Sequence, residues 1–223
     1  MSKSIRRESP LVGCHLATHT PETGQEAGVL LGERPFIGHI NLRGDASEPA
    51  FLKAVAGVLG FNLPGEPNTV AEGNGQVVYW LGPNEWLLVI PQEQESELIF
   101  ALRAALSEVF AAITDISSGQ TVIAIDGEHA RDLLAKGCTL DLHPRVFRPG
   151  TCAQTLLAKA PVLIRHRPDA PLFELIVRRS FADYLWRWLE EASKEFGMTI
   201  MAPAVSEAPS ASKVAALRDR AMA

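Results

Sequence analysis

The stretch of sequence that decides the fold runs from residue 121 to residue 163. It opens with Thr121-Val-Ile-Ala-Ile-Asp-Gly-Glu, continues with His129-Ala-Arg-Asp-Leu-Leu-Ala-Lys-Gly-Cys and, after a loop containing proline and glycine, closes with Cys152-Ala-Gln-Thr-Leu-Leu-Ala-Lys-Ala-Pro-Val-Leu. The β-branched run at 121–125 predicts a strand that stops at the Asp-Gly pair, and the next apolar residues recur at helical spacing. Gly137 is expected to end that helix in the left-handed conformation, which suits a residue without Cβ. The stretch therefore predicts a strand, a short helix, a long loop and a second strand over residues 153–164.

The chain on either side follows a similar plan. Residues 1–35 lack a sustained period and predict an irregular N-terminal arm with room for one short strand. The next segment predicts a strand at 37–42, a helix ending at Gly60, a hairpin over 76–90 and an amphipathic helix over 98–110. After the stretch described above, we expect a turn at 167–171, a strand at 172–177 and a helix capped by Ser180.

The two halves also match in sequence. Ile40-Asn-Leu-Arg-Gly-Asp and Ile123-Ala-Ile-Asp-Gly-Glu both precede a pair of apolar helical residues, a glycine and a loop. Repeated units of this kind are expected to bury their sheets against helices. We therefore predict an α+β fold made of duplicated β-α-β-β-α units, at 36–110 and 111–197. An Ala/Ser/Pro-rich tail at 198–223 is too poor in large apolar residues to add to a core and is expected to be flexible.

Composition limits the classes of function. The 223 residues are 47% hydrophobic and 21% charged, as is typical of a soluble globular protein. The formal net charge of −5 gives no electrostatic reason to expect nucleic acid or an anionic membrane as a partner. Three cysteines without paired spacing fit a reducing compartment, and no apolar segment follows the charged N-terminus as it would in a secretory signal. We expect a cytoplasmic protein.

The sequence lacks the common signatures of a catalytic site. It contains no Gly-x-Gly-x-x-Gly, P-loop or Gly-x-Ser-x-Gly pattern. His15 and His19 have the spacing of a helical metal site, but nearby proline and glycine residues argue against a helix there. Cys138 and His143 could form a reactive pair in the central loop, although a small thiol after a helix end more often serves packing. We predict no catalytic, cofactor-binding or metal-binding residue.

Two features suggest surface contacts. Arg165, His166 and Arg167 predict a basic hairpin tip, which is either a solvated turn or a contact for an acidic partner or anion. Trp186 lies off the apolar stripe of the last helix and is expected to face outward, where a large aromatic side chain favours a partner surface. The stripe itself is predicted to consist of Phe181, Tyr184, Leu185, Trp188, Leu189, Ala192 and Phe196.

One set of stretches carries a family resemblance. It consists of Ser9-Pro-Leu, Leu81-Gly-Pro-Asn-Glu-Trp-Leu-Leu, Asp115-Ile-Ser, Gly119-Gln-Thr, Leu134-Ala-Lys-Gly-Cys-Thr-Leu-Asp-Leu-His-Pro, Phe147-Arg-Pro-Gly and Cys152-Ala-Gln-Thr-Leu-Leu-Ala-Lys. Together they resemble the gamma subunit family of heterotetrameric sarcosine oxidase, over most of residues 9–197. That family is similar in turn to the folate-binding aminomethyltransferase (T-protein) of glycine cleavage, whose duplicated α+β lobes agree with the repeat predicted above.

The resemblance implies a role in an oxidoreductase complex. Such complexes oxidatively demethylate sarcosine to glycine with formation of hydrogen peroxide, and yield 5,10-methylenetetrahydrofolate or formaldehyde. FAD, FMN and NAD are expected in the alpha and beta subunits and zinc in the delta subunit, with no cofactor on this chain. The gamma subunit is expected to be non-catalytic and to pack against its partners. We predict that the contact surface includes Cys138, Leu140, Leu142, His143, Phe147 and Trp186.

Three alternatives remain open. The chain could be a free-standing folate-binding or one-carbon-transfer protein, which tight binding of tetrahydrofolate by the isolated chain would favour. It could also be the gamma chain of a related dehydrogenase of another N-methyl amino acid. Finally, Lys136-Gly-Cys138 resembles the motif of folate-type iron–sulfur assistance proteins, in which case Cys138→Ser would abolish function without lowering stability.

Overall fold

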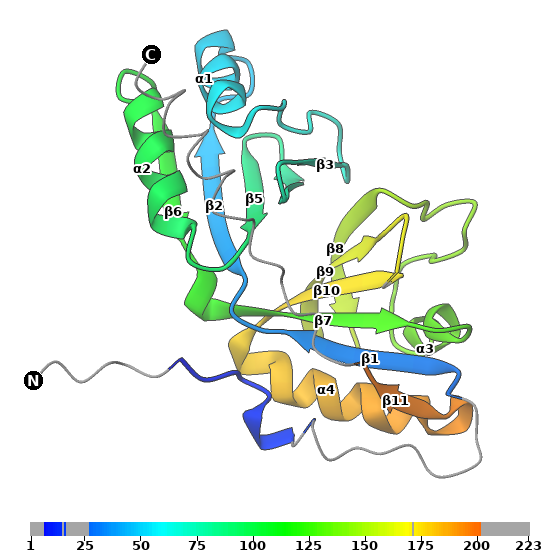
Figure 1. Ribbon diagram of the computed structural model, residues 1–223. Coiled ribbons are helices and arrows are strands. Elements are labelled where there is room, and N and C mark those ends of the chain that lie inside the picture. The colour runs from blue at the N-terminus through cyan, green and yellow to red at the C-terminus, as the bar shows by residue number, and fades with distance from the viewer. Residues whose placement is uncertain (1–6, 15, 17–26, 171, 202–223) are drawn as a thin grey trace, which may run out of the picture.

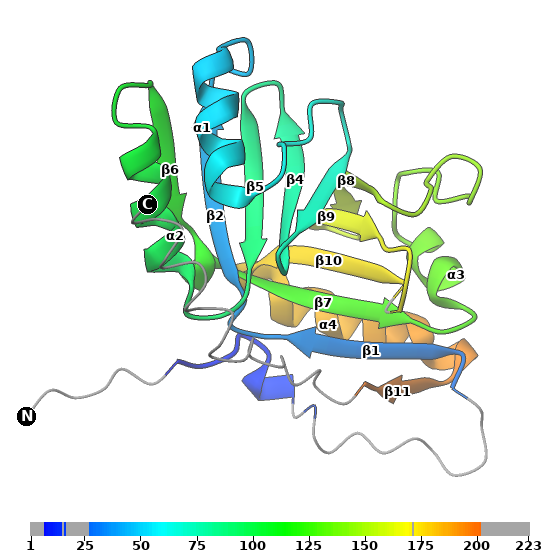
Figure 2. The ribbon, with the colours of Figure 1, turned by 45° about the horizontal axis from the view of Figure 1, so that its top comes forward.

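The computed structural model describes residues 7–14, 16, 27–170 and 172–201. This part of the chain forms two β-sheets whose outer faces are covered by helices (Figures 1 and 2). The helices are α1 (Pro49–Leu59), α2 (Glu95–Ala105), α3 (Ala130–Ala135) and α4 (Arg179–Ser193), with short 3₁₀ helices η1 (Val12–Cys14), η3 (Ser117–Gly119) and η4 (Lys194–Phe196). The predicted α+β class is confirmed.

The five-stranded sheet is built from one continuous segment of the chain. Its strands are β2 (Gly38–Gly44), β3 (Val70–Gly73), β4 (Gln76–Gly82), β5 (Glu85–Ile90) and β6 (Ala111–Asp115), in the spatial order β3-β4-β5-β2-β6. All of its pairs are antiparallel. Because side chains alternate along a strand, Ile40, Leu42 and Leu88 point to the face that α1 and α2 cover.

The six-stranded sheet takes strands from both ends of the described chain. They are β1 (Val29–Arg34), β7 (Gln120–Asp126), β8 (Thr151–Leu157), β9 (Ala160–His166), β10 (Phe173–Arg178) and β11 (Met198–Ile200), in the spatial order β11-β1-β7-β10-β9-β8. The pair β1–β11 is parallel and the others are antiparallel. Ile123, Ile125 and Leu175 belong to the apolar core between this sheet and the helices α3 and α4.

The inner faces of the two sheets pack against each other. They enclose a third buried cluster made of Tyr79, Leu87, Val122, Cys152, Leu163 and Ile176. The chain crosses directly from one sheet to the other between β1 and β2 and again at η3, and the strands of the two sheets run crosswise (Figures 1 and 2). Corners formed by strands that switch sheets are typical of orthogonal sheet packing. The result is a helix–sheet–sheet–helix arrangement with three buried layers, one between the sheets and one between each sheet and its helices.

The sheets do not respect the predicted unit boundaries. β1 lies in the predicted N-terminal arm but pairs with β7, and β6 follows the predicted boundary at residue 110 but pairs with β2. β1 is buried at most of its positions on both faces, so its sequence does not alternate and gives no clear strand pattern. Which strand it pairs with is a long-range choice that local periodicity does not encode.

The predicted single strand over 153–164 is wrong. The structure divides this run into β8 and β9, joined by the two-residue turn Ala158-Lys159. Ala158 adopts a φ of 52°, which lies in the left-handed region that alanine seldom occupies. Because neither turn residue is glycine or asparagine, the sequence carried no signal for the hairpin.

Helix α4 packs most of the predicted stripe against the core, but Tyr184 is exposed and Trp186 is buried in addition. It begins at Arg179, so Ser180 lies inside the first turn instead of capping the helix. Trp186 is fully buried, and its Nε1–H donates to Glu190 Oε1 at 2.7 Å, whereas Tyr184 is 39% exposed. The prediction that Trp186 faces outward is therefore wrong. A carboxylate one turn further along the helix satisfies the indole N–H, so the ring can fill the core.

Gly60 and Gly137, which lie near the ends of α1 and α3, are needed for different reasons. Gly60 has a φ of 82° and ends α1 as predicted. Gly137 does not adopt a left-handed conformation; a Cβ at this position would lie 2.6 Å from Trp188 Cζ2 and 3.2 Å from the backbone nitrogen of Ala158. Glycine is needed at 137 because α4 and the β8–β9 turn come too close for any side chain.

We expect Gly137→Ala to lower the free energy of unfolding by about 1–3 kcal/mol, the usual cost of overpacking. The matched control is Gly57→Ala, which lies inside α1 with open space around its Cβ position. This control should raise stability by up to about 1 kcal/mol through helix propensity. Urea unfolding followed by circular dichroism measures both, and a stabilising effect at 137 would contradict the close approach.

Candidate functional site

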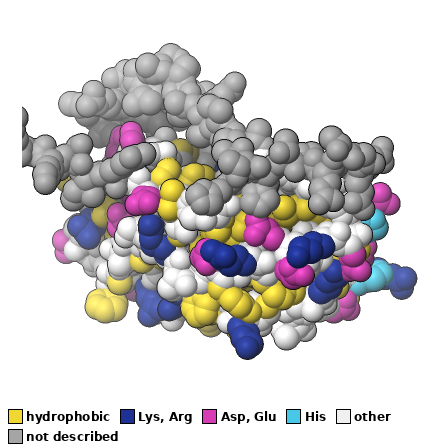
Figure 3. Space-filling model, turned by 90° about the horizontal axis from the view of Figure 1, so that it is seen from below, with side chains coloured by type: hydrophobic (Ala, Val, Ile, Leu, Met, Phe, Trp, Pro, Cys, Tyr) yellow, Lys and Arg dark blue, Asp and Glu magenta, His cyan; other side chains and the backbone are white. Residues whose placement is uncertain are grey.

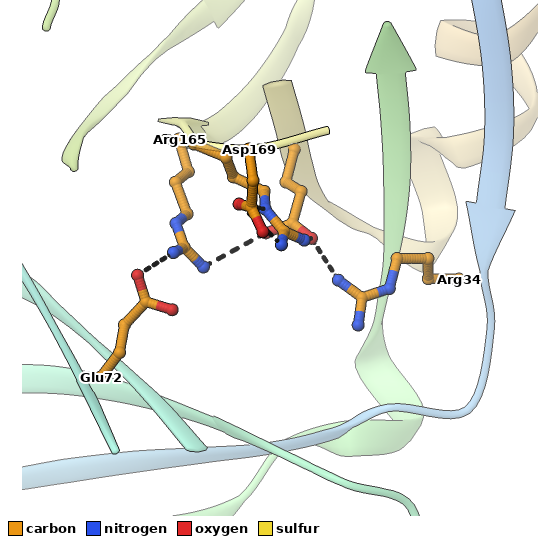
Figure 4. A network of polar contacts seen from close by, with 6 residues as sticks. Arg34, Glu72, Arg165 and Asp169 are labelled. Carbon is orange, nitrogen blue, oxygen red and sulfur yellow. Dashed lines mark hydrogen bonds and ion pairs between the residues drawn. The ribbon is translucent and has the colours of Figure 1, made fainter. Parts of the chain in front are cut away.

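A group of charged side chains lies on the inner face of the six-stranded sheet (Figure 4). Its centre is Glu174 of β10, whose side chain is 3% exposed. Arg165 Nη1 of β9 lies 3.5 Å from Glu174 Oε2, and Arg167 Nη1 lies 3.0 Å from Glu174 Oε1. Arg34 of β1 reaches across β7 to the same carboxylate. Three arginines therefore surround one buried carboxyl group, and burying such a group is costly unless it is paired.

Arg165 connects the two sheets. Its guanidinium group, also 3% exposed, forms an ion pair with Glu72 of β3 and lies 5.8 Å from the ring centroid of Tyr79 in β4. Burial raises the pKa of the Tyr79 phenol, and the negative charge of Glu174 adds to this effect. Tyr79 therefore remains neutral at physiological pH and serves as a packing partner for the guanidinium.

The charges of this network balance one another. Its members are Arg34, Arg165, Arg167, Glu72, Asp169 and Glu174, three cations and three carboxylates. Asp169 lies in the exposed turn before β10 and accepts hydrogen bonds from Arg167. Since each guanidinium already faces a carboxylate, the arrangement acts as an internal clamp between the sheets.

The prediction of a basic hairpin tip at Arg165, His166 and Arg167 is wrong, because the first two of these side chains lie in the interior. Strand β9 extends to His166, so Arg165 and His166 are 2% and 3% exposed instead of lying in a solvated turn. Nδ1 of His166 lies 2.9 Å from the carbonyl oxygen of Phe147, and the imidazole stacks on the rings of Phe147 and Phe173. Burial lowers the pKa of His166. The imidazole is a neutral structural group.

We expect Glu174→Gln to lower the free energy of unfolding by about 3–5 kcal/mol, because it leaves buried guanidinium groups without a counter-charge. Asp169→Asn is the control from the same network; its side chain is 68% exposed, and exposed ion pairs contribute at most about 1 kcal/mol. Chemical denaturation of both variants gives the comparison. Equal, small losses would show that the network does not hold the sheets together.

His39 is a second buried titratable group. It lies at the start of β2, is 1% exposed, and its Nδ1 lies 2.9 Å from the carbonyl oxygen of Ile37. Because a carbonyl only accepts, Nδ1 carries the proton, and Nε2 has no hydrogen-bond partner among the described residues. Burial lowers the pKa of His39 to about 4. The ring is therefore neutral in the folded protein near neutral pH.

This burial predicts a pH dependence of stability. Between the folded pKa of about 4 and the ordinary value of 6.5, the unfolded chain binds a proton that the folded chain does not. The contribution of the neutral His39 to the free energy of unfolding is therefore complete above pH 6.5 and is lost as the pH falls toward 4. At 1.36 kcal/mol per pKa unit, the loss is about 3 kcal/mol. We expect His39→Asn to show a shallower fall than the unmodified protein in urea unfolding at a series of pH values. If the free energy of unfolding fell equally with pH in the variant and in the unmodified protein, His39 would not be the source of the pH dependence.

The residues predicted for the partner surface divide into two groups. Leu142 and Phe147 are 4% and 7% exposed and, with Trp186, fill the core around α3 and α4. Their burial inside the chain leaves no side-chain surface for a partner. Cys138 and Leu140 are half-buried at the edge of the same core, and His143 is exposed. The sequence could not separate the two groups because apolar residues in a loop serve equally well as anchors and as contacts.

Cys138 and His143 do not form a reactive pair. His143 Nδ1 accepts the backbone N–H of Arg145 at 3.2 Å, while Cys138 pairs through its backbone with Leu157. No hydrogen bond joins the two side chains in the described structure. Lys136, of the Lys-Gly-Cys sequence, forms an ion pair with Glu195. The contacts of Lys136 and Cys138 therefore serve the structure.

An open groove of about 750 Å³ lies where the N-terminal segment meets the start of α4. Its lining residues are Glu8, Ser9, Pro10, Val12, Gly119, Arg178, Arg179 and Ser180. Arg179 donates to the carbonyl oxygen of Glu8 at 2.8 Å, which ties the segment to the helix. Figure 3 views the side that carries α4, where basic, acidic and apolar side chains are interspersed. The visible part of this face thus carries mixed charge.

The described residues contain neither a metal-binding cluster nor a membrane-spanning helix. Within the described residues, no group of three His, Cys, Asp or Glu side chains is placed to hold a metal ion, and no helix has the length and apolarity to cross a membrane. The predicted pair His15 and His19, and the predicted tail from residue 202 onward, lie outside the described residues.

Solved structures define the class of the fold. Aminomethyltransferase T of the glycine cleavage system from Bartonella henselae matches with a TM-score of 0.61 at 13% identity, covering 79% of this chain and 48% of that chain. This likeness shows the fold alone, and it confirms the predicted aminomethyltransferase-like architecture. A heterotetrameric sarcosine oxidase from Corynebacterium sp. U-96, in complex with pyrrole 2-carboxylate, contains a chain that matches with a TM-score of 0.77 at 31% identity, covering 88% of this chain and 99% of that chain.

Sequence comparison then gives the family. The model of the sarcosine oxidase, gamma subunit family matches residues 43–195. Sarcosine oxidase subunit gamma from Corynebacterium sp. (strain U-96) is 32% identical over 191 residues, covering 85% of this chain and 91% of the relative. The subunit from Arthrobacter sp. is 33% identical over 202 residues, covering 90% and 96%. The chain belongs to the sarcosine oxidase gamma subunit family, as its motifs predicted.

Proposed function

We propose that this chain is the non-catalytic gamma subunit of a heterotetrameric sarcosine oxidase. The observation that carries the proposal is its match to a chain of such an oxidase over 99% of that chain's length. The interior agrees with a supporting role, because the buried charged groups Arg165 and Glu174 are engaged with each other. The neutral, buried imidazoles of His39 and His166 likewise serve the fold.

The proposed complex oxidatively demethylates sarcosine to glycine. Hydrogen peroxide forms, together with 5,10-methylenetetrahydrofolate or formaldehyde. FAD, FMN and NAD belong in this proposal to the alpha and beta subunits and zinc to the delta subunit, with no cofactor on this chain. A cytoplasmic location fits the three cysteines, all of which are free thiols.

We also propose that the fold arose by duplication. The spatial orders β3-β4-β5-β2-β6 and β8-β9-β10-β7-β1 correspond position by position, and β11 extends the second sheet. In each half a helix follows the first strand, and a second helix follows the last strand of the three-stranded run. The repeated unit is then β-α-β-β-β-α, one strand longer than the predicted β-α-β-β-α unit.

The surface supports a role in assembly. Phe100 on α2 is 77% exposed and Phe110 before β6 is 96% exposed. Aromatic side chains exposed to this extent are enriched at protein–protein contacts. Of the predicted contact residues, Cys138, Leu140 and His143 retain surface that a partner can reach.

Co-purification from the native organism tests the proposed function. We expect the tagged full-length chain to recover flavin-bearing polypeptides that oxidise sarcosine, and to be colourless when it is produced alone. Titration calorimetry should detect no tight binding of tetrahydrofolate by the isolated chain.

Recovery of the chain by itself, together with tight tetrahydrofolate binding, would contradict the proposal and favour a free-standing folate protein. A recovered complex that oxidises another N-methyl amino acid but not sarcosine would contradict the substrate.

A further inference from the structure

We propose that the tip of the loop between α3 and β8, formed by Arg145, Val146 and Arg148, docks onto an acidic surface of a catalytic partner subunit. The loop spans residues 136–150 and contains no helix or strand. Loops of this length inside a compact domain are usually either functional or disordered. The loop extends outward on the side of the molecule that carries α3 and β8 (Figures 1 and 2).

Buried anchors hold this loop in one conformation. Leu142 and Phe147 insert into the core, and their carbonyl oxygens accept hydrogen bonds from the side chains of Arg131 and His166. The backbone N–H of Gly150 donates to the carbonyl oxygen of His166 at 2.8 Å. A loop fixed at three points loses little conformational entropy when it binds, which favours affinity.

The turn between the anchors is also ordered by its own hydrogen bonds. The backbone N–H groups of Val146 and Phe147 donate to the carbonyl oxygen of His143 at 2.8 and 2.9 Å. Asp141 accepts the backbone N–H of His143 at 2.9 Å, and Arg148 Nε donates to the carbonyl oxygen of Arg145 at 3.3 Å. These bonds fix the direction in which the intervening side chains leave the loop.

The side chains between the anchors point to solvent and carry uncompensated positive charge. Arg145 and Arg148 are exposed and have no carboxylate partner among the described residues, and Val146 between them is 63% exposed. The exposed Arg178 and Arg179 at the start of α4 likewise lack a carboxylate partner among the described residues, but Arg179 is tied to the carbonyl oxygen of Glu8. The loop tip differs from that pair because an exposed apolar side chain, Val146, lies between its two arginines.

The chemistry of this tip defines its partner. Two guanidinium groups beside an apolar side chain match a protein surface with carboxylates around a small apolar depression, and arginine is enriched in interface hot spots. A protein surface fits better than a small anion because the tip is an exposed turn with an apolar centre. The identification of the partner as a catalytic subunit rests on the proposed function.

Charge reversal in the full-length chain tests this inference. The double variant Arg145→Glu, Arg148→Glu should weaken binding to the purified partner subunits at least about tenfold and flatten the salt dependence of the association rate. The matched control is Lys53→Glu, Arg187→Glu, which makes the same change in net charge at exposed positions on α1 and α4. It should change the affinity by less than about twofold, as surface substitutions outside an interface do. Val146→Ser, without a change of charge, should weaken binding but keep the salt dependence.

The outcomes separate this inference from the proposed function. Thermal unfolding midpoints close to that of the unmodified chain will confirm that the double variant folds. If the unmodified chain assembles and the double variant binds its partners equally well, the docking surface is refuted and the proposed function stands. If both double variants weaken binding equally, net charge and not the tip is responsible, which also refutes the inference. Failure of the unmodified chain to bind any flavin-bearing partner would refute the proposed function itself.

Discussion

The guanidinium group of Arg165 is the contact on which the arrangement of the two sheets depends most directly. It leaves the inner face of one sheet, pairs with Glu174 beside it, and reaches Glu72 and the ring of Tyr79 on the other sheet. An arginine is costly in such a place unless it is paired, and both Nη groups of Arg165 bond to carboxylates, while its Nε has no hydrogen-bond partner among the described residues. The surrounding cluster of apolar side chains excludes water and fixes the crossing of the sheets, while the ion pairs select one geometry among those that apolar packing alone would permit.

This use of charge explains how a chain with many ionisable groups can act as a supporting subunit. The buried side chains of Arg165 and Glu174 pair with each other, and the buried imidazoles of His39 and His166 bond to backbone carbonyls. The outer surface then presents features that a rigid body can offer to neighbours, namely exposed phenylalanines on one sheet layer and a fixed cationic loop on the other. Membership of the sarcosine oxidase gamma subunit family and the shared aminomethyltransferase-like fold agree with this division of roles.

The fold class, the family and most of the strongly patterned elements could be predicted from the sequence, because amphipathic periodicity and turn residues are local signals. Gly60 marked the end of α1, for example, through the conformation that glycine permits. The partners of β1 and β6 could not be predicted, since strand pairing joins residues far apart in the chain. The turn at Ala158 could not be predicted either, because alanine rarely adopts a left-handed conformation.

The charged network was also beyond local reasoning. Arg165 and Arg167 in the sequence suggest an exposed turn, and only the extension of β9 and the position of Glu174 on β10 place them in the interior. The burial of Trp186 could not be predicted, because the apolar stripe of the helix is broad and the indole N–H is satisfied by Glu190. In both cases a polar partner determined whether the residue is buried: Glu174 on the neighbouring strand for Arg165, and Glu190 one turn along the helix for Trp186.

The side chains between the two sheets are expected to make the sheets unfold together as one cooperative unit. Differential scanning calorimetry tests this claim most directly. We expect a single unfolding transition whose calorimetric enthalpy equals its van't Hoff enthalpy, as a two-state unit requires. Two separate transitions, or a calorimetric enthalpy about twice the van't Hoff value, would mean that each sheet melts with its own helices and would contradict the account.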